Sequence, residues 1–300
     1  MSSTIIVGFD GRDHAADALA LGRLLAARAG ARLLVVCAYP EDPLGESGAA
    51  ADAGTLAREE AEAALARARE LAAAEAGAEV EVEHHALAGP KPSAVLHELA
   101  ERTDAAAIVV GATHHGAAVR LLTGSTPERV LDGAPCPVAV APSGYARQAP
   151  VGTAPLRIAV AFDDSPEAAQ ALATAADLAR RAGGRLRVLT AVNGAVGLYP
   201  PLDPGAYAEI AELARTAARE RLDAAVAELE GVEADTAVLD GEPAVALLDD
   251  ARDDDLLVCG SGGKGPFRRV LMGSVSTTLL REAACPVVIV PRGSGEGSSS

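Results

Sequence analysis

Aromatic residues are scarce in this sequence: they make up 2% of its 300 residues and include no Trp. Hydrophobic residues still account for 49% of the chain, so its cores must be built from Leu, Val, Ile and Ala. Basic residues are also in deficit, because 26 Lys and Arg stand against 42 Asp and Glu, which gives a net charge of −16. Nucleic acids and anionic membranes are bound by basic surfaces, so we expect neither as a partner.

Cysteine is also scarce, and the cysteines are not grouped. The four of them form no C-x-x-C pair, and each lies in or beside an apolar segment. They are Cys37, Cys136, Cys259 and Cys285. This placement predicts buried free thiols instead of disulfides or a metal site. His84 and His85 do not suggest a metal site either, because neighbouring residues in a strand point to opposite faces.

Long apolar runs are missing, since no segment approaches the ~20 residues of a membrane helix. The N-terminal residues MSSTIIVGFDGRD reach acidic side chains too early for a signal peptide. We therefore expect a cytoplasmic protein. No Ser-His-Asp or Cys-His set suggests itself, so we predict no catalytic residue.

The sequence does contain an internal repeat. The segment TIIVGFDGRDHAADALALGRLLAARAG matches LRIAVAFDDSPEAAQALATAADLARRAGG, which pairs Asp10 with Asp163. Further along, Gly111 pairs with Gly260, and the offset changes from 153 to 149 residues through loop-length differences. A repeat unit of this length is a whole domain, unlike the short units of a solenoid.

Composition and the repeat together give the domain boundaries. We predict domains over residues 1–143 and 155–292, and a disordered tail over 293–300. The segment between them, PSGYARQAPVGTAP, has the Pro and Gly content of a linker.

Strand and helix patterns alternate within each predicted domain. In the first domain the strand patterns cover residues 4–10, 32–39, 79–87, 105–112 and 137–142, and the helix patterns lie near 14–29, 56–77, 92–102 and 125–133. Three of these strands are nearly continuous apolar runs, which is typical of parallel sheets covered on both faces. The order predicts an α/β fold: two tandem, doubly wound, five-stranded parallel-sheet domains.

Ligands of such sheets bind at the carboxyl ends of the strands, where the strand order reverses. An Asp ends the first strand of each domain, as Asp10 and as Asp163. A glycine-rich turn follows the fourth strand, as GATHHGAAVRLLTGS over residues 111–125 and as GSGGKGPFRRVLMGS over residues 260–274. If strands one and four are neighbours, both features face one crevice.

The second turn has the chemistry of a phosphate site. Glycines let backbone N–H groups approach phosphate oxygens, and Gly273-Ser274 opens the next helix, whose N-terminus attracts anions. The turn is not a Walker A loop, because Lys264 is followed by Gly265. Explanations without a ligand remain open at this point. Ser125 fits an S-x-x-E capping box, Ser274 fits an N-cap, and an Asp after a strand often forms a turn.

These residues resemble the signature of the universal stress protein family. That signature is G-x2-G-x9-G-[S/T] after strand four, followed by a helix and a final strand of the type A-P-C-P-V-x-V. The second domain matches it with Gly260, Gly263, Gly273 and Ser274, followed by AACPVVIV. The first domain matches it with Gly111, Gly124, Ser125 and APCPVAV, but His114 occupies the place of the second glycine.

The resemblance implies an adenine-nucleotide-binding fold and ATP, with or without magnesium, as the ligand. It places Asp163 near the adenine and ribose, Ala191 beside the adenine, and Gly260 near the ribose, while Gly263, Gly273 and Ser274 hold the phosphates. In the first domain, Asp10, Ala38, Gly111, Gly124 and Ser125 take these roles. We expect weaker binding there, because His114 adds a Cβ and a ring where the backbone approaches phosphate.

Three functions remain open. The first is a nucleotide-dependent regulator or sensor in the stress response, without fast turnover. The second is a slow ATPase or nucleotide-dependent transferase in which Asp163 or Asp164 binds magnesium or orients a water. The third is a scaffold that dimerises and binds partner proteins. Family members dimerise through the last strand, so the resemblance also implies pairing of 137–142 with 286–291 within the chain, or a homodimer.

Overall fold

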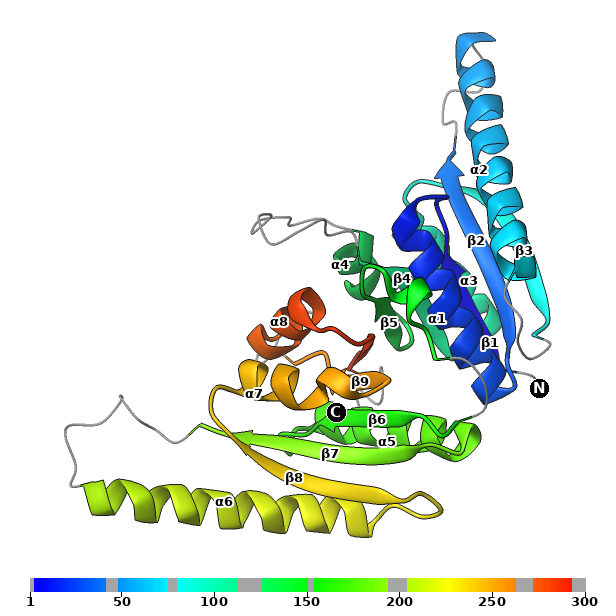
Figure 1. The fold of residues 1–300 in the computed structure, drawn as a ribbon. Coiled ribbons are helices and arrows are strands. Elements are labelled where there is room, and N and C mark those ends of the chain that lie inside the picture. Colours follow the sequence, from blue (N-terminus) through cyan, green and yellow to red (C-terminus); the bar gives the residue numbers. More distant parts are fainter. Residues whose placement is uncertain are drawn as a thin grey trace, which may run out of the picture. The chain divides into compact units, whose positions relative to one another are not determined.

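The chain was analysed as a computed structural model, which describes residues 3–41, 48–74, 80–112, 126–150, 154–193, 204–262 and 272–292. It divides into two compact units that meet in the sequence between Ala154 and Pro155. Unit 1 denotes the part up to Ala154, and unit 2 the part from Pro155 onward. Figure 1 shows strands alternating with helices in both units.

Unit 1 contains a parallel sheet of five strands in the order β3-β2-β1-β4-β5. Its elements are β1 (Thr4–Gly8), α1 (Asp13–Ala29), β2 (Arg32–Pro40), α2 (Gly48–Ala74), β3 (Val82–Gly89), α3 (Pro92–Thr103), β4 (Ala107–Gly111), α4 (Thr126–Leu131), β5 (Val138–Ala141) and the 3₁₀ helix η1 (Tyr145–Arg147). Helices α1 and α2 contact each other, as do α3 and α4. Right-handed crossovers place these two pairs on opposite faces of the sheet.

Unit 2 repeats this topology, with a parallel sheet in the order β8-β7-β6-β9-β10. Its elements are β6 (Arg157–Ala161), α5 (Pro166–Ala182), β7 (Arg185–Val192), α6 (Pro204–Ala227), β8 (Ala234–Asp240), α7 (Pro243–Asp250), the 3₁₀ helix η2 (Ala251–Asp253), β9 (Leu256–Gly260), α8 (Ser274–Glu282) and β10 (Val287–Val290). The predicted fold class is confirmed in both units.

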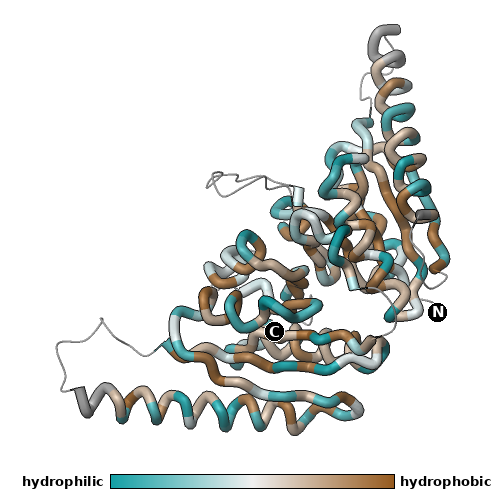
Figure 2. Tube along the Cα trace, in the orientation of Figure 1, coloured by the Kyte–Doolittle hydropathy of each residue, from teal (hydrophilic) through white to brown (hydrophobic). Residues whose placement is uncertain are grey.

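The central strands hold the core of each unit. Ile6 in β1 and Ile158 in β6 are both fully buried, and Figure 2 shows hydrophobic residues concentrated along the strands. Helices on both faces exclude water from these strands, which explains why their sequences are nearly continuous apolar runs. Helix α1 ends at Gly30 and α5 at Gly183, both in the left-handed conformation that glycine adopts without strain.

Two segments differ from the sequence expectations. Helix α2 begins at Gly48, eight residues before the predicted start at residue 56, because the intervening alanines favour helix and extend it. The predicted linker is partly folded onto unit 1. The carboxylate of Asp17, which is 5% exposed, accepts hydrogen bonds from the backbone N–H groups of Gly144 and Ala146, each at 2.8 Å. The Pro and Gly content of the linker could not predict these hydrogen bonds to Asp17 of α1.

In each unit the strand order reverses between the first and the fourth strand, at β1 and β4 in unit 1 and at β6 and β9 in unit 2. The chain leaves these neighbouring strands at their carboxyl ends in opposite directions, so a crevice opens there. The residues predicted to bind the ligand follow these strands.

Candidate functional site

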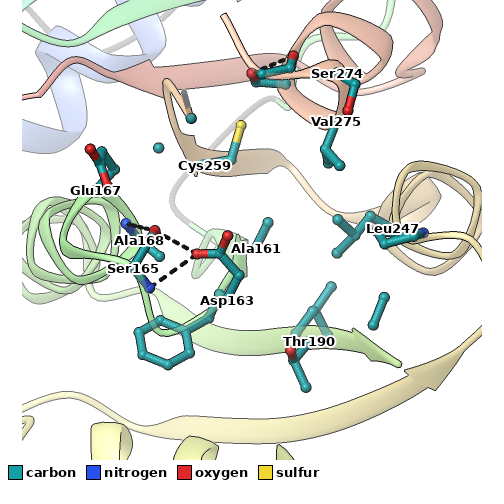
Figure 3. Close-up of a pocket in the computed structure, with 18 of the residues that line it drawn as sticks. Ala161, Asp163, Ser165, Glu167, Ala168, Thr190, Leu247, Cys259, Ser274 and Val275 are labelled. Carbon is teal, nitrogen blue, oxygen red and sulfur yellow. Dashed lines mark hydrogen bonds between the residues drawn. The ribbon is translucent and has the colours of Figure 1, made fainter. Parts of the chain in front are cut away.

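A pocket of about 690 Å³ lies at the carboxyl ends of β6, β7 and β9. Five of the six site residues predicted for the second domain line it, namely Asp163, Ala191, Gly260, Gly273 and Ser274. The sixth, Gly263, lies outside the described residues. In Figure 3, Asp163 and Ser165 lie on the α5 side, and Ser274 and Val275 lie across the pocket from them.

The loop after β6 positions Asp163. Its Oδ1 accepts hydrogen bonds from the backbone N–H of Ser165 at 3.2 Å and from the Ser165 hydroxyl at 2.5 Å. The Ser165 Oγ in turn accepts from the N–H of Ala168 at 3.1 Å and so caps α5. Asp163 therefore forms a turn after the strand, which is one of the explanations that need no ligand. The same turn holds Asp163 in the wall of the pocket.

Gly260 has a packing reason to be glycine. A Cβ at this position would lie 2.8 Å from the carbonyl carbon of Glu167, in the first turn of α5. Unit 1 repeats the contact more tightly, because a Cβ at Gly111 would lie 1.8 Å from the carbonyl oxygen of His14. These two glycines therefore let the first helix of each unit pack on the fourth strand, whether or not a ligand binds.

The N-terminus of α8 is built on a contact between two glycines. A Cβ on Gly262, which has a φ of 60°, would lie 3.4 Å from the Cα of Gly273. The N–H of Gly273 donates to the carbonyl of Ser261 at 3.0 Å. The buried hydroxyl of Ser276 lies 2.9 Å from the same carbonyl oxygen and fixes the turn.

The N-cap of α8 is Gly273, with an extended backbone, and Ser274 is the first helical residue. The interpretation of Ser274 as the N-cap is therefore wrong by one position. Side-chain capping does not start this helix, because Ser276 and the two glycines shape its first turn instead. The first residues of α8, from Ser274 to Ser276, line the pocket together with Gly273.

The charged residues among those that line the pocket are Asp163, Glu167 and Arg292. The side chain of Glu167 is 7% exposed and that of Arg292 is 58% exposed. The Nε and Nη2 atoms of Arg292 both contact Oε1 of Glu167. Sequence reasoning missed this pair, because its members are 125 residues apart and neither belongs to a motif.

In unit 1 the described site residues are Asp10, which follows β1, Ala38, which lies two residues before the end of β2, and Gly111, which ends β4. Oδ1 of Asp10 accepts from the backbone N–H of Arg12 at 3.1 Å, and Nε2 of His14 lies 3.2 Å from Oδ2. Burial works to raise the pKa of Asp10, but the hydrogen bonds from His14 and Arg12 outweigh it and lower that pKa.

The other residues predicted to bind in the first domain lie outside the described part of the chain. They are His114, Gly124 and Ser125. The capping box that starts at Ser125 falls in the same segment. The effect of His114 on binding therefore stays a prediction.

The four cysteines are free and buried, as predicted. Cys259 lines the pocket, and burial, together with the charge of Asp163, raises its pKa to about 12. A thiol with this pKa is protonated at neutral pH and is a poor nucleophile.

Metal and membrane features can be judged for the same part of the chain. Within the described ranges, no group of three or more His, Cys, Asp and Glu side chains is arranged to hold a metal ion. His85, one of the two neighbouring histidines considered above, contacts a carboxylate: its Nε2 lies 3.1 Å from Oε2 of Glu83. Among the residues that the structure describes, no helix is both long enough and apolar enough to cross a membrane.

Two tandem α/β domains, each doubly wound around a parallel sheet, define a Rossmann-like class of protein, with a ligand-sized pocket at the reversal of strand order in unit 2. The model of the universal stress protein family matches residues 1–142 and 156–291. The chain therefore belongs to the universal stress protein family, and the resemblance seen in its motifs is confirmed.

The chain is similar to several individual proteins. Universal stress protein Rv2319c from Mycobacterium tuberculosis is 31% identical over 71% of this chain and 73% of its own length. The crystal structure of a universal stress protein from Archaeoglobus fulgidus covers 98% of this chain and 100% of its own, with a TM-score of 0.64 and 20% identity. A universal stress protein solved in complex with cAMP covers 47% of this chain and 98% of its own, with 30% identity and a TM-score of 0.39.

Proposed function

We propose that this universal stress protein binds ATP in the pocket of unit 2 and acts in the stress response as a nucleotide-dependent regulator or sensor. One observation carries the proposal: the predicted site residues that the structure describes in unit 2, which are far apart in the sequence, all line one pocket. Residues that matched the family signature only by chance would not be expected to lie together at one edge of the sheet.

The pocket suits a nucleotide in size and in polarity. Small-molecule sites typically span roughly 300–1,000 Å³, and the value of about 690 Å³ lies within this range. Apolar side chains of Phe162, Leu189 and Leu247 offer a surface for a base. The N-terminus of α8 at Gly273 and Ser274 offers backbone N–H groups and a hydroxyl to an anion.

The chemistry of the pocket favours binding over fast turnover. The Cys259 thiol is protonated, and the Glu167 carboxylate is held by Arg292. This leaves Asp163 as the carboxylate among the lining residues that could bind magnesium or orient a water, as the ATPase alternative requires. Loss of a measurable ATPase rate in Asp163→Asn would favour that alternative, and no turnover in the wild type would exclude it.

The direct test is isothermal titration of the full chain with ATP, with cAMP and adenosine as comparison ligands. We expect ATP to bind with one site at high affinity, in unit 2. Absence of heat at millimolar ATP, together with no nucleotide released from the purified protein on denaturation, would contradict the proposal and favour the scaffold function.

The assembly and location predicted from the resemblance and the sequence remain part of the proposal. Pairing of 137–142 with 286–291 within one chain predicts a monomer, whereas use of these strands between chains predicts a homodimer. Light scattering separates the two, because the chain mass is 30.2 kDa. The cytoplasmic location stays a prediction, and fractionation of the source cells tests it.

A further inference from the structure

The ion pair between Glu167 and Arg292 lines the same pocket as Gly273 and Ser274, where the proposed phosphates would lie. Strand β10 pairs with β9 so that Val290 is opposite Gly260, and the N–H of Ser261 donates to the carbonyl of Val290 at 2.9 Å. Ser261 in turn accepts from Gly273 at the N-terminus of α8. Ser261 thus links the end of β10 to the start of α8, and Arg292, two residues after β10, lines the same pocket as that helix start.

The two partners differ sharply in exposure. Glu167 is almost fully buried, so its carboxylate needs a counter-charge at close range. Arg292 supplies it through Nε and Nη2, while more than half of its side chain stays exposed. A guanidinium carries five N–H donors in a planar fork. It can hold a carboxylate on one edge and offer donors to a second anion.

The pair has no counterpart in unit 1. The repeat places His14 where unit 2 has Glu167, and Ser143 where unit 2 has Arg292. His14 instead lies 3.2 Å from Asp10. At these two positions the pair of a buried carboxylate and an arginine is thus a feature of unit 2, although both units have the same topology.

We infer that Arg292 contacts the phosphates of the bound nucleotide in unit 2, and that Glu167 is the positioning residue that aims it. This inference rests on the proposed function and names the side chain that selects phosphorylated ligands. Without Arg292, the formal charges of Asp163 and Glu167 would both repel a nucleoside triphosphate. With it, one of the two charges is neutralised, and a donor faces the phosphates.

The test compares ATP and adenosine binding by titration calorimetry in full-length wild type and Arg292→Gln. A hydrogen bond to a charged group supports a loss of about tenfold or more in ATP affinity, with adenosine affinity nearly unchanged. Arg252→Gln is the matched control, because Arg252 is an exposed arginine of unit 2 that does not line the pocket. An equal loss of ATP affinity in this control would overturn the inference, because bulk charge would then explain it.

A second variant separates phosphate contact from support of Glu167. In the double variant Glu167→Gln, Arg292→Gln, no buried carboxylate is left without a partner. If Arg292 acts on phosphate, the double variant keeps the lowered ratio of ATP to adenosine affinity. Recovery of the wild-type ratio would overturn the inference, because Arg292 would then serve only Glu167.

Arg292→Lys gives a further readout, since it keeps the charge and loses the planar fork. We expect it to recover part of the ATP affinity, and no recovery beyond Arg292→Gln would count against a phosphate contact. If the wild type binds neither ligand, the proposed function fails and the inference with it. If the wild type binds ATP and Arg292→Gln binds it equally well, only the inference fails.

Discussion

Arg187 in β7 donates from Nη1 to Oδ2 of Asp254 at 2.6 Å, and the side chain of Asp254 is 2% exposed. The other terminal nitrogen of Arg187 donates to Asp250 at 2.5 Å. The repeat places Leu34 and Ala105 of unit 1 where unit 2 has Arg187 and Asp254. Both are buried and apolar. Unit 1 therefore has an apolar contact where unit 2 has a partly buried ion pair.

This difference predicts the stability of two variants. Arg187→Leu leaves the buried carboxylate of Asp254 without a partner and should destabilise unit 2 by about 3–5 kcal/mol. The double variant Arg187→Leu, Asp254→Ala copies unit 1 and should recover most of that loss, because apolar replacement of a buried pair is often neutral. Hydrogen exchange of the β7 and β9 amides in urea measures both. A double variant as unstable as the single one would contradict the prediction.

The glycines that end β4 and β9 predict a second effect on stability. Gly111→Ala brings a Cβ to 1.8 Å from the His14 carbonyl oxygen, and Gly260→Ala brings one to 2.8 Å from backbone atoms of Glu167. Backbone cannot yield as a side chain does, so we expect losses of about 1–3 kcal/mol, with the larger loss for Gly111→Ala.

Gly273→Ala is the control for both variants. Its Cβ would meet Gly262 at 3.4 Å, an ordinary contact, and its φ is −64°. Local unfolding of each unit is again read by hydrogen exchange. Equal losses of stability in all three variants would contradict the prediction. The close packing of α1 on β4 and of α5 on β9 would then not be the reason for glycine at these positions.

The sequence predicted a parallel, doubly wound sheet in each unit, because apolar runs alternate with amphipathic helices and right-handed crossovers then cover both faces of the sheet. It also predicted five of the residues that line the pocket, because the carboxyl ends of neighbouring strands meet at one edge. It failed where a residue's role depends on distant contacts. The pairing of Glu167 with Arg292, the cap at Gly273 and the anchor at Asp17 all depend on groups that the fold brings together, and no local pattern encodes them.

The proposed phosphate position predicts a large loss of ATP affinity for one change at Gly273 and nearly unchanged affinity for another. Gly273→Asp places a carboxylate at the N-terminus of α8, where it satisfies the same N–H groups that a phosphate would bind. We expect ATP affinity to fall by about a hundredfold, since charge repulsion adds to this competition. Gly273→Ala, which fits in the available space, should retain binding within a few fold. Titration with ATP checks both, and equal affinities would contradict a phosphate at this helix.

The carboxylate of Asp10 gives a pH-dependent prediction for unit 1. The interaction with His14 helps to keep the pKa of Asp10 below its ordinary value. A lowered pKa means that the charged form is favoured in the folded state. The resulting stabilisation is present above the ordinary pKa and is lost as the pH falls through the lowered value.

His14→Ala should therefore raise the pKa of Asp10 and make unit 1 lose stability at a higher pH during acidification. The measurement is the ¹³C shift of the Asp10 carboxyl carbon against pH, in wild type and variant. His85→Ala serves as the control, because the His85 ring lies against Glu83 in β3 and β2 separates that strand from β1. If His14→Ala leaves the Asp10 titration unchanged, the backbone N–H of Arg12 must supply the stabilisation, and His14 would then serve only to complete the first turn of α1.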